Sequence, residues 1–210
     1  MKFKNYLFDL DGTLTDPETG IKNSILYALV KCGLPPLTGD TLNAFIGPPL
    51  LDSFQIYCGV SPENAKILLQ YYREYFKEKG MFENTVYPGI KETLQALKKR
   101  GSRLYIATSK PEPFAKQILE HFNLMEYFSF VGGSTLDETR TKKEEVIQYV
   151  LKECDLNPAD CLMVGDRYYD IEGARSCGIM VAAVLFGYGD ADELKTADYL
   201  IDEAKNLLII

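Results

Sequence analysis

From Pro88 onward, the chain alternates between helical segments and short, nearly continuous apolar runs. The apolar runs predict strands at 103–107, 127–131, 161–165 and 179–185, and near 199–201. The segments between them predict helices over 88–100, 112–122, 142–154 and 168–177, and near 190–196. Apolar strands that alternate with helices are typical of a parallel sheet covered on both faces. The functional site of such a sheet lies beyond the carboxyl ends of its strands.

The first 87 residues follow a different pattern. Residues 3–10 form a short apolar run that predicts one more buried strand. No convincing strand follows over 20–87, where a helix around Ile21–Leu29 precedes further helical segments near 38–46, 50–58 and 62–80. We therefore expect an α/β core formed by residues 1–15 and 88–210, with an inserted all-helical domain over 16–87.

Composition narrows the classes of partner. The 210 residues carry a net charge of −7, which argues against binding to nucleic-acid polymers or anionic membranes. No apolar stretch reaches the roughly 18–20 residues of a membrane span, and no signal peptide is apparent. Five cysteines, scattered and odd in number, favour reduced thiols in the cytoplasm. We expect a cytoplasmic protein, a monomer, with a small molecule as its partner.

Polar residues cluster where the predicted strands end. Asp9-Leu10-Asp11-Gly12-Thr13 follows the first strand, and Gly12 would permit the turn that brings both carboxylates to one place. Three further clusters fall at the same edge of the sheet, namely Thr108/Ser109, Lys142/Lys143 and Asp166/Asp170. Each alone is consistent with a helix cap or a solvated loop. Together they predict one site.

This set of motifs resembles the haloacid dehalogenase (HAD) superfamily, in its phosphatase branch, and within that the phosphoglycolate phosphatase-like group with a helical cap. The resemblance covers the whole chain, from the D-x-D-G-T motif to Gly165-Asp166-Arg167-Tyr168-Tyr169-Asp170. It implies a Rossmann-like (HAD-type) parallel sheet with an inserted helical cap. It also implies a phosphoric monoester hydrolase that uses Mg²⁺ and an aspartyl-phosphate intermediate.

The resemblance assigns roles to the two acids of the first motif. Asp9 would be the nucleophile and a metal ligand. Asp11 would protonate the leaving group, then activate water, and would bind the metal through its backbone carbonyl. The acidic motif would complete the metal site, with Asp166 as a direct ligand and Asp170 binding directly or through water, because their oxygens suit Mg²⁺.

The resemblance also assigns the groups that would hold the phosphoryl oxygens. Thr108 would donate a hydrogen bond to the transferring group, and the backbone amide of Ser109 could assist. A lysine would neutralise the phosphoryl oxygens and Asp9. Many relatives have Lys-Pro at that position, whereas this chain has Lys142-Lys143-Glu144-Glu145. We expect Lys142 to be the site lysine and Lys143 to be solvated.

The substrate is less constrained than the reaction. Lys22 and the turn at Gly47 are candidate substrate contacts from the cap, and Arg73 is a weaker one. Phosphoglycolate and nucleoside monophosphates, the latter implying a 5'-nucleotidase, are both open as substrates. A phosphosugar mutase of the β-phosphoglucomutase type and a non-catalytic binding module are further alternatives.

Overall fold

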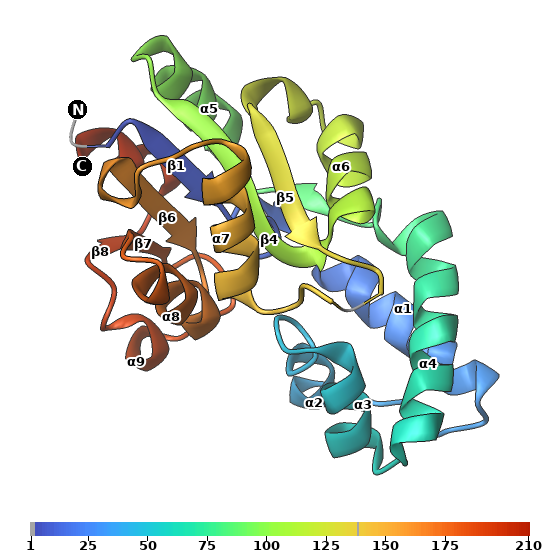
Figure 1. Ribbon diagram of the computed structural model, residues 1–210. Coiled ribbons are helices and arrows are strands. Elements are labelled where there is room, and N and C mark those ends of the chain that lie inside the picture. Colours follow the sequence, from blue (N-terminus) through green and yellow to red (C-terminus); the bar gives the residue numbers. More distant parts are fainter. Residues whose placement is uncertain (1–2, 138) are drawn as a thin grey trace. The chain divides into compact units, whose positions relative to one another are not determined.

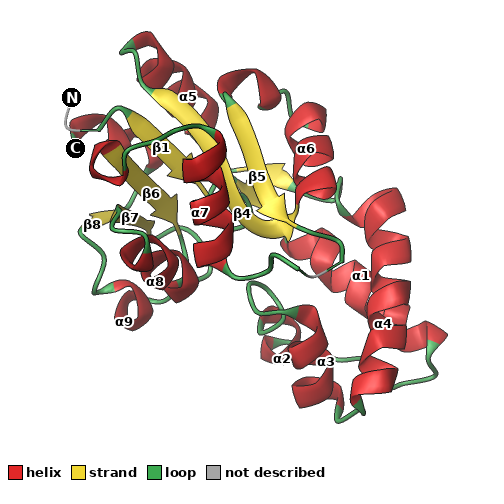
Figure 2. Cartoon of the chain, in the orientation of Figure 1, coloured by secondary structure: helices red, strands yellow, loops and turns green. Residues whose placement is uncertain are grey.

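The computed structural model describes residues 3–137 and 139–210, and its larger compact unit is built on a parallel sheet (Figures 1 and 2). The strands are β1 (Asn5–Phe8), β4 (Arg103–Pro111), β5 (Phe130–Ser134), β6 (Cys161–Gly165), β7 (Met180–Val184) and β8 (Tyr199–Ile201). Their order is β5-β4-β1-β6-β7-β8, and the pairs are parallel. Strand β1 therefore lies between β4 and β6, in the middle of the sheet.

Both faces of the sheet are buried, as the apolar runs predicted. Successive residues of β1, Tyr6, Leu7 and Phe8, point to opposite faces, and all are at most 2% exposed. On one face, Leu7 belongs to a core with Ile147 of α7 and Ile171 of α8. The helices of this unit are α5 (Ile90–Lys99), α6 (Glu112–His121), α7 (Lys143–Glu153), α8 (Tyr168–Ser176) and α9 (Ala191–Leu194). The predicted α/β class with a parallel sheet is confirmed.

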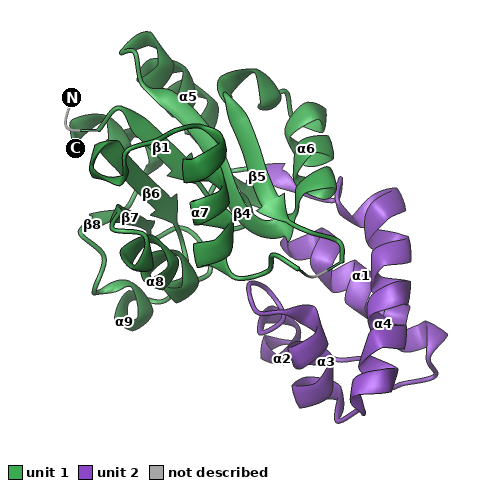
Figure 3. Cartoon of the chain, in the orientation of Figure 1, with its two compact units in different colours: residues 1–16, 86–210 green, residues 17–85 purple. Residues whose placement is uncertain are grey.

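The second compact unit is Pro17–Thr85 (Figure 3), and the first comprises the chain up to Asp16 and from Val86. The second unit contains α1 (Glu18–Lys31), α2 (Asp40–Asn43), α3 (Leu50–Cys58) and α4 (Pro62–Tyr75), which continues as a π-helical turn over Phe76–Gly80. Helix α4 begins at residue 62, as predicted. The side chain of Ser61 caps it by accepting a hydrogen bond from the backbone amide of Asn64. Two short strands, β2 (Thr15–Asp16) and β3 (Thr85–Val86), pair where the chain passes between the units.

Several predicted boundaries were wrong. Strand β5 lies three residues later than the predicted 127–131. The prediction missed its second half because Gly132 and Gly133 have low strand propensity. A Cβ on Gly133 would lie 2.6 Å from Cα of Glu112, so close packing of two backbones requires glycine there. Strand β4 extends to Pro111, with a register shift against β5 after Ala107. The two-residue strand β3 falls in a region where no strand was expected.

Within the described ranges 3–137 and 139–210, the structure has no helix that is both long enough and apolar enough to cross a membrane.

Candidate active site

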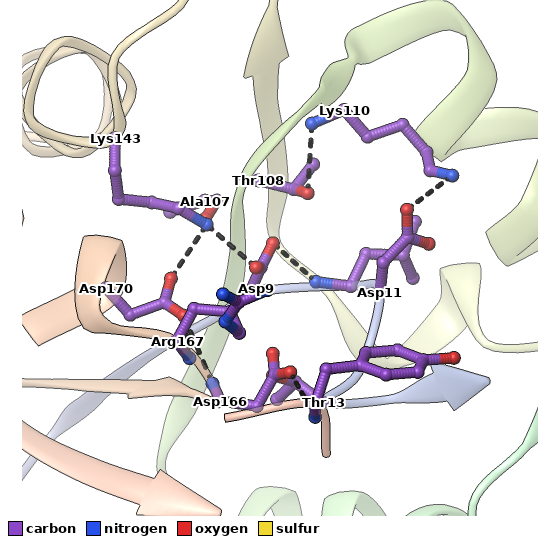
Figure 4. A network of polar contacts seen from close by, with 12 residues as sticks. Asp9, Asp11, Thr13, Ala107, Thr108, Lys110, Lys143, Asp166, Arg167 and Asp170 are labelled. Carbon is purple, nitrogen blue, oxygen red and sulfur yellow. Dashed lines mark hydrogen bonds and ion pairs between the residues drawn. The ribbon is translucent and has the colours of Figure 1, made fainter. Parts of the chain in front are cut away.

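The central residues of the site lie at the carboxyl ends of three adjacent strands, β4, β1 and β6. In the sheet register, Phe8 of β1 lies beside Ile106 of β4 and Val164 of β6. Asp9 follows Phe8 directly, while Thr108 and Asp166 each lie two residues beyond the paired position. Because the strands are parallel, these residues emerge at one edge of the sheet, around Asp9 (Figure 4).

Lys143, at the first position of α7, lies within this cluster. Its Nζ is 2.9 Å from Asp9 Oδ2, 2.8 Å from Asp170 Oδ1 and 3.2 Å from the carbonyl oxygen of Ala107. Burial opposes its charge, but the carboxylates of Asp170 and Asp9 outweigh that effect and raise the pKa of the ammonium group. Lys143 therefore lies in the site as a cation.

The expectation that Lys142 would be the site lysine was wrong. Lys142 is exposed and precedes α7, whereas Lys143 is buried. The carboxylate of Glu145 accepts hydrogen bonds from the backbone amides of Thr141 and Lys142, which starts the helix at Lys143. The lysine side chain that turns toward the sheet is therefore one residue later than expected.

Asp166 and Asp170 are almost completely buried beside the D-x-D-G-T loop. Asp166 accepts hydrogen bonds from Thr13 Oγ1 at 3.0 Å and from the backbone amide of Tyr188 at 2.9 Å. The second carboxylate, Asp170, accepts from the amides of Asp166 and Arg167 at 3.1 and 3.0 Å. Both acids are therefore held rigidly, as metal ligands in proteins commonly are.

The charge balance of the site suits a divalent cation. Carboxylate oxygens of Asp9, Asp166 and Asp170 lie within 4.8 Å of one another. Burial, together with the charges of Asp170 and Asp9, raises the pKa of Asp166 well above its usual value. When ionised, these three carboxylates face one ammonium group, that of Lys143. Two negative charges thus remain to be balanced, and hard oxygen donors of this kind suit Mg²⁺.

Asp11 lies in the site with a partner that the sequence did not predict. Its Oδ2 is 2.5 Å from Nζ of Lys110, on the last part of β4. Burial raises the pKa of the Asp11 carboxyl group, and the charge of Lys110 partly offsets that rise. The sequence signal for Lys110 was only its position two residues after Thr108.

The other predicted residues differ in their surroundings. Thr108 is 1% exposed, and its Oγ1 accepts a hydrogen bond from the amide of Lys110 at 3.2 Å. The neighbouring Ser109 is exposed. Lys22 and Gly47 belong to the second unit, where Lys22 forms an ion pair with Glu18 and Gly47 has a φ of 105°.

Known proteins share this architecture. Residues 6–184 match the family described as haloacid dehalogenase-like hydrolase. A 5'-nucleotidase of Pseudomonas aeruginosa is 45% identical over 195 residues, covering 93% of this chain and 88% of that protein. Phosphoglycolate phosphatase 1 of the same species is 30% identical, covering 96% and 77% respectively.

A solved structure agrees with the sequence matches. The structure of Mycobacterium tuberculosis protein tyrosine kinase A (PtkA) aligns with 98% of this chain and over 96% of the PtkA chain, with 34% sequence identity and a TM-score of 0.85. The family match spans most of the chain and the fold is shared. The chain therefore belongs to the haloacid dehalogenase-like hydrolases, the family that its motifs predicted.

Proposed function

We propose that this chain is a Mg²⁺-dependent phosphatase that hydrolyses a small phosphomonoester through an aspartyl-phosphate on Asp9. One observation carries the proposal: the Asp9 carboxylate lies 2.9 Å from Nζ of the buried Lys143 and clusters with two buried carboxylates, at the carboxyl end of the central strand. A carboxylate in such surroundings is suited to nucleophilic attack on an anionic ester.

In the first half-reaction, an oxygen of Asp9 attacks phosphorus. A bond forms between this oxygen and phosphorus, and the bond from phosphorus to the ester oxygen breaks. Asp11 gives its proton to the departing oxygen, so the product leaves as an alcohol. The ammonium of Lys143 and the hydroxyl of Thr108 bind the phosphoryl oxygens, with the amide of Ser109 as a further donor.

In the second half-reaction, water attacks the phosphorus of the aspartyl-phosphate. Asp11, now ionised, takes a proton from this water, and the bond between Asp9 and phosphorus breaks. Orthophosphate leaves, and both acids return to their starting states.

The carboxylates of Asp9, Asp166 and Asp170 would hold the Mg²⁺ ion, together with the backbone carbonyl of Asp11. When bound, the ion supplies positive charge that lets an anionic nucleophile approach an anionic ester. The excess of two negative charges that these three carboxylates carry over Lys143 supports this assignment.

Two substrate classes have specific support. Phosphoglycolate is favoured by the relative named phosphoglycolate phosphatase 1, and nucleoside monophosphates are favoured by the 45% identical 5'-nucleotidase. Lys22 and Gly47 of the helical unit remain our proposed contacts to the substrate. We further propose that the protein acts in the cytoplasm as a monomer, which its scattered cysteines and charge of −7 favour.

A phosphate-release screen tests the proposal. The purified protein is incubated with phosphoglycolate, a panel of 5'-nucleoside monophosphates and β-glucose 1-phosphate, in Mg²⁺ or in EDTA. We expect one orthophosphate per alcohol released, only with Mg²⁺, and none from Asp9→Asn. Undiminished release by Asp9→Asn would contradict the role of Asp9. Glucose 6-phosphate formed without orthophosphate would identify a mutase instead.

A further inference from the structure

Lys110, near the end of β4, pairs with Asp11 of the D-x-D-G-T loop, and the mechanism above gives it no part. Its side chain is only 7% exposed, and its Nζ lies 2.5 Å from Asp11 Oδ2. Figure 4 shows this side chain reaching to Asp11, well separated from Lys143. The two lysines therefore have separate tasks, since Lys143 contacts Asp9 and Asp170.

The backbone of Lys110 is held on both sides. Its amide donates to Thr108 Oγ1 at 3.2 Å, and the next residue, Pro111, pairs with Ser134 of β5. Its carbonyl oxygen lies so close to Gly133 that a Cβ there would be 2.7 Å away. The lysine side chain thus begins from a fixed point at the end of the strand.

The two oxygens of Asp11 are in different situations. Oδ2 is bound by Lys110, whereas Oδ1 is buried and has no hydrogen-bond partner among the described residues. A buried carboxylate oxygen without a partner is costly, and such atoms commonly mark a place where a ligand or a reacting group binds.

We propose that Lys110 is a positioning residue that holds Oδ2 of Asp11 and so directs Oδ1 toward the group that exchanges a proton. This role rests on the proposed function, in which Asp11 protonates the leaving oxygen and then deprotonates water. A misplacement of about 1 Å in such a group can cost about 10²-fold in rate. The competing role for Lys110 is direct binding of the substrate phosphate.

A comparison of two esters in Lys110→Met separates these roles. p-Nitrophenolate is a weak base that departs with little help from an acid, whereas the alkoxide of an alkyl phosphate requires a proton. We expect kcat/KM for glycerol 2-phosphate to fall by about 10²-fold, with KM little changed. With p-nitrophenyl phosphate, kcat/KM should change little, but the steady-state rate should fall, since Asp11 is still needed to activate water. Release of p-nitrophenol should therefore begin with a burst.

A double-mutant cycle with Asp11→Asn tests whether Lys110 acts through Asp11. If it does, adding Lys110→Met to Asp11→Asn causes no further loss of activity. Lys205→Met is the matched control, because Lys205 forms an equally short 2.5 Å pair with Glu203 on the exposed surface. The thermal midpoints of all variants establish that they are folded.

Two results would overturn this role while leaving the proposed function in place. One is a loss of kcat/KM that is equal for both esters, accompanied by a higher KM and additive with Asp11→Asn, which would indicate phosphate binding. The other is unchanged activity in Lys110→Met. A wild-type protein that releases phosphate from neither ester, nor from the metabolite panel, would instead remove the proposed function and this role with it.

Discussion

Oδ2 of Asp166 occupies the space in which a side chain on Gly12 would begin. Gly12 also has a φ of 77°, a conformation that favours glycine. The turn of the D-x-D-G-T motif and the acidic motif are therefore packed directly against each other, although they are far apart in the sequence. This contact accounts for glycine at position 12 by sterics as well as by backbone conformation.

Gly12→Ala should abolish most of the activity, because the new methyl group displaces Asp166. We expect a loss of at least about 10²-fold in kcat, measured by phosphate release, and a lower free energy of unfolding in urea. Gly101→Ala is the control, since Gly101 has a φ of 88° but open space around it. That variant should lose about 1–2 kcal/mol of stability and no activity. Equal effects in the two variants would refute the steric account.

Lys143→Met should lose activity and stability, whereas Lys142→Met should lose neither. Removal of Lys143 leaves Asp9 and Asp170 without their shared cation, so we expect a drop in kcat of about 10²-fold or more. Losing one partner of a buried ion pair also costs about 3–5 kcal/mol of stability. The exposed Lys142 should be dispensable on both measures. Full activity in Lys143→Met would show that its contact with Asp9 serves folding alone.

Mg²⁺ should stabilise the folded protein. At 100 times its Kd, a ligand adds about 2.7 kcal/mol, and each kcal/mol raises the Tm of a protein of this size by about 2–4 °C. Asp166→Asn should remove most of this rise, because it removes a carboxylate ligand from the cluster. Asp192→Asn, at a side chain that is 95% exposed, should retain it. The Tm is measured by calorimetry with and without Mg²⁺. A rise in Tm in Asp166→Asn equal to that of the wild type would exclude Asp166 as a ligand.

Thr108→Val should impair catalysis without unfolding the protein. Valine keeps the shape of the buried threonine but removes the hydroxyl that would donate to the phosphoryl group. Loss of one such donor costs about 10²–10³-fold in kcat. Thr93→Val in α5, where the threonine is 2% exposed, controls for the general effect of this exchange in the interior. Similar kinetics in the two variants would remove Thr108 from the mechanism.

The fold was predictable because its strands are short, apolar and separated by helices. The runs that became β6 and β8 matched their predicted bounds of 161–165 and 199–201. The prediction failed where local propensity and tertiary packing disagree. Gly132 and Gly133 belong to β5 because neighbouring backbone leaves no room for a side chain, and such packing has no local sequence signal.

The candidate site was predictable to the extent that it depends on strand ends. Asp9, Thr108 and Asp166 each follow an apolar run, and parallel pairing alone brings them together. The choice between Lys142 and Lys143 depended on the residue at which a helix begins, and Glu145 was an available capping signal. Lys110 was not identified, because this strand was expected to end at residue 107, whereas β4 extends to Pro111 and includes Lys110.

The most direct test of the account is the position of the phosphoryl group during turnover. Wild-type protein is mixed with substrate and Mg²⁺, quenched in acid within the first turnovers, digested and mapped by mass spectrometry. We predict a phosphoryl group on the peptide that contains Asp9, located on Asp9 by fragmentation and missing from Asp9→Asn. An active enzyme with no phosphorylated intermediate, or with the phosphoryl group on another residue, would contradict Asp9 as the nucleophile.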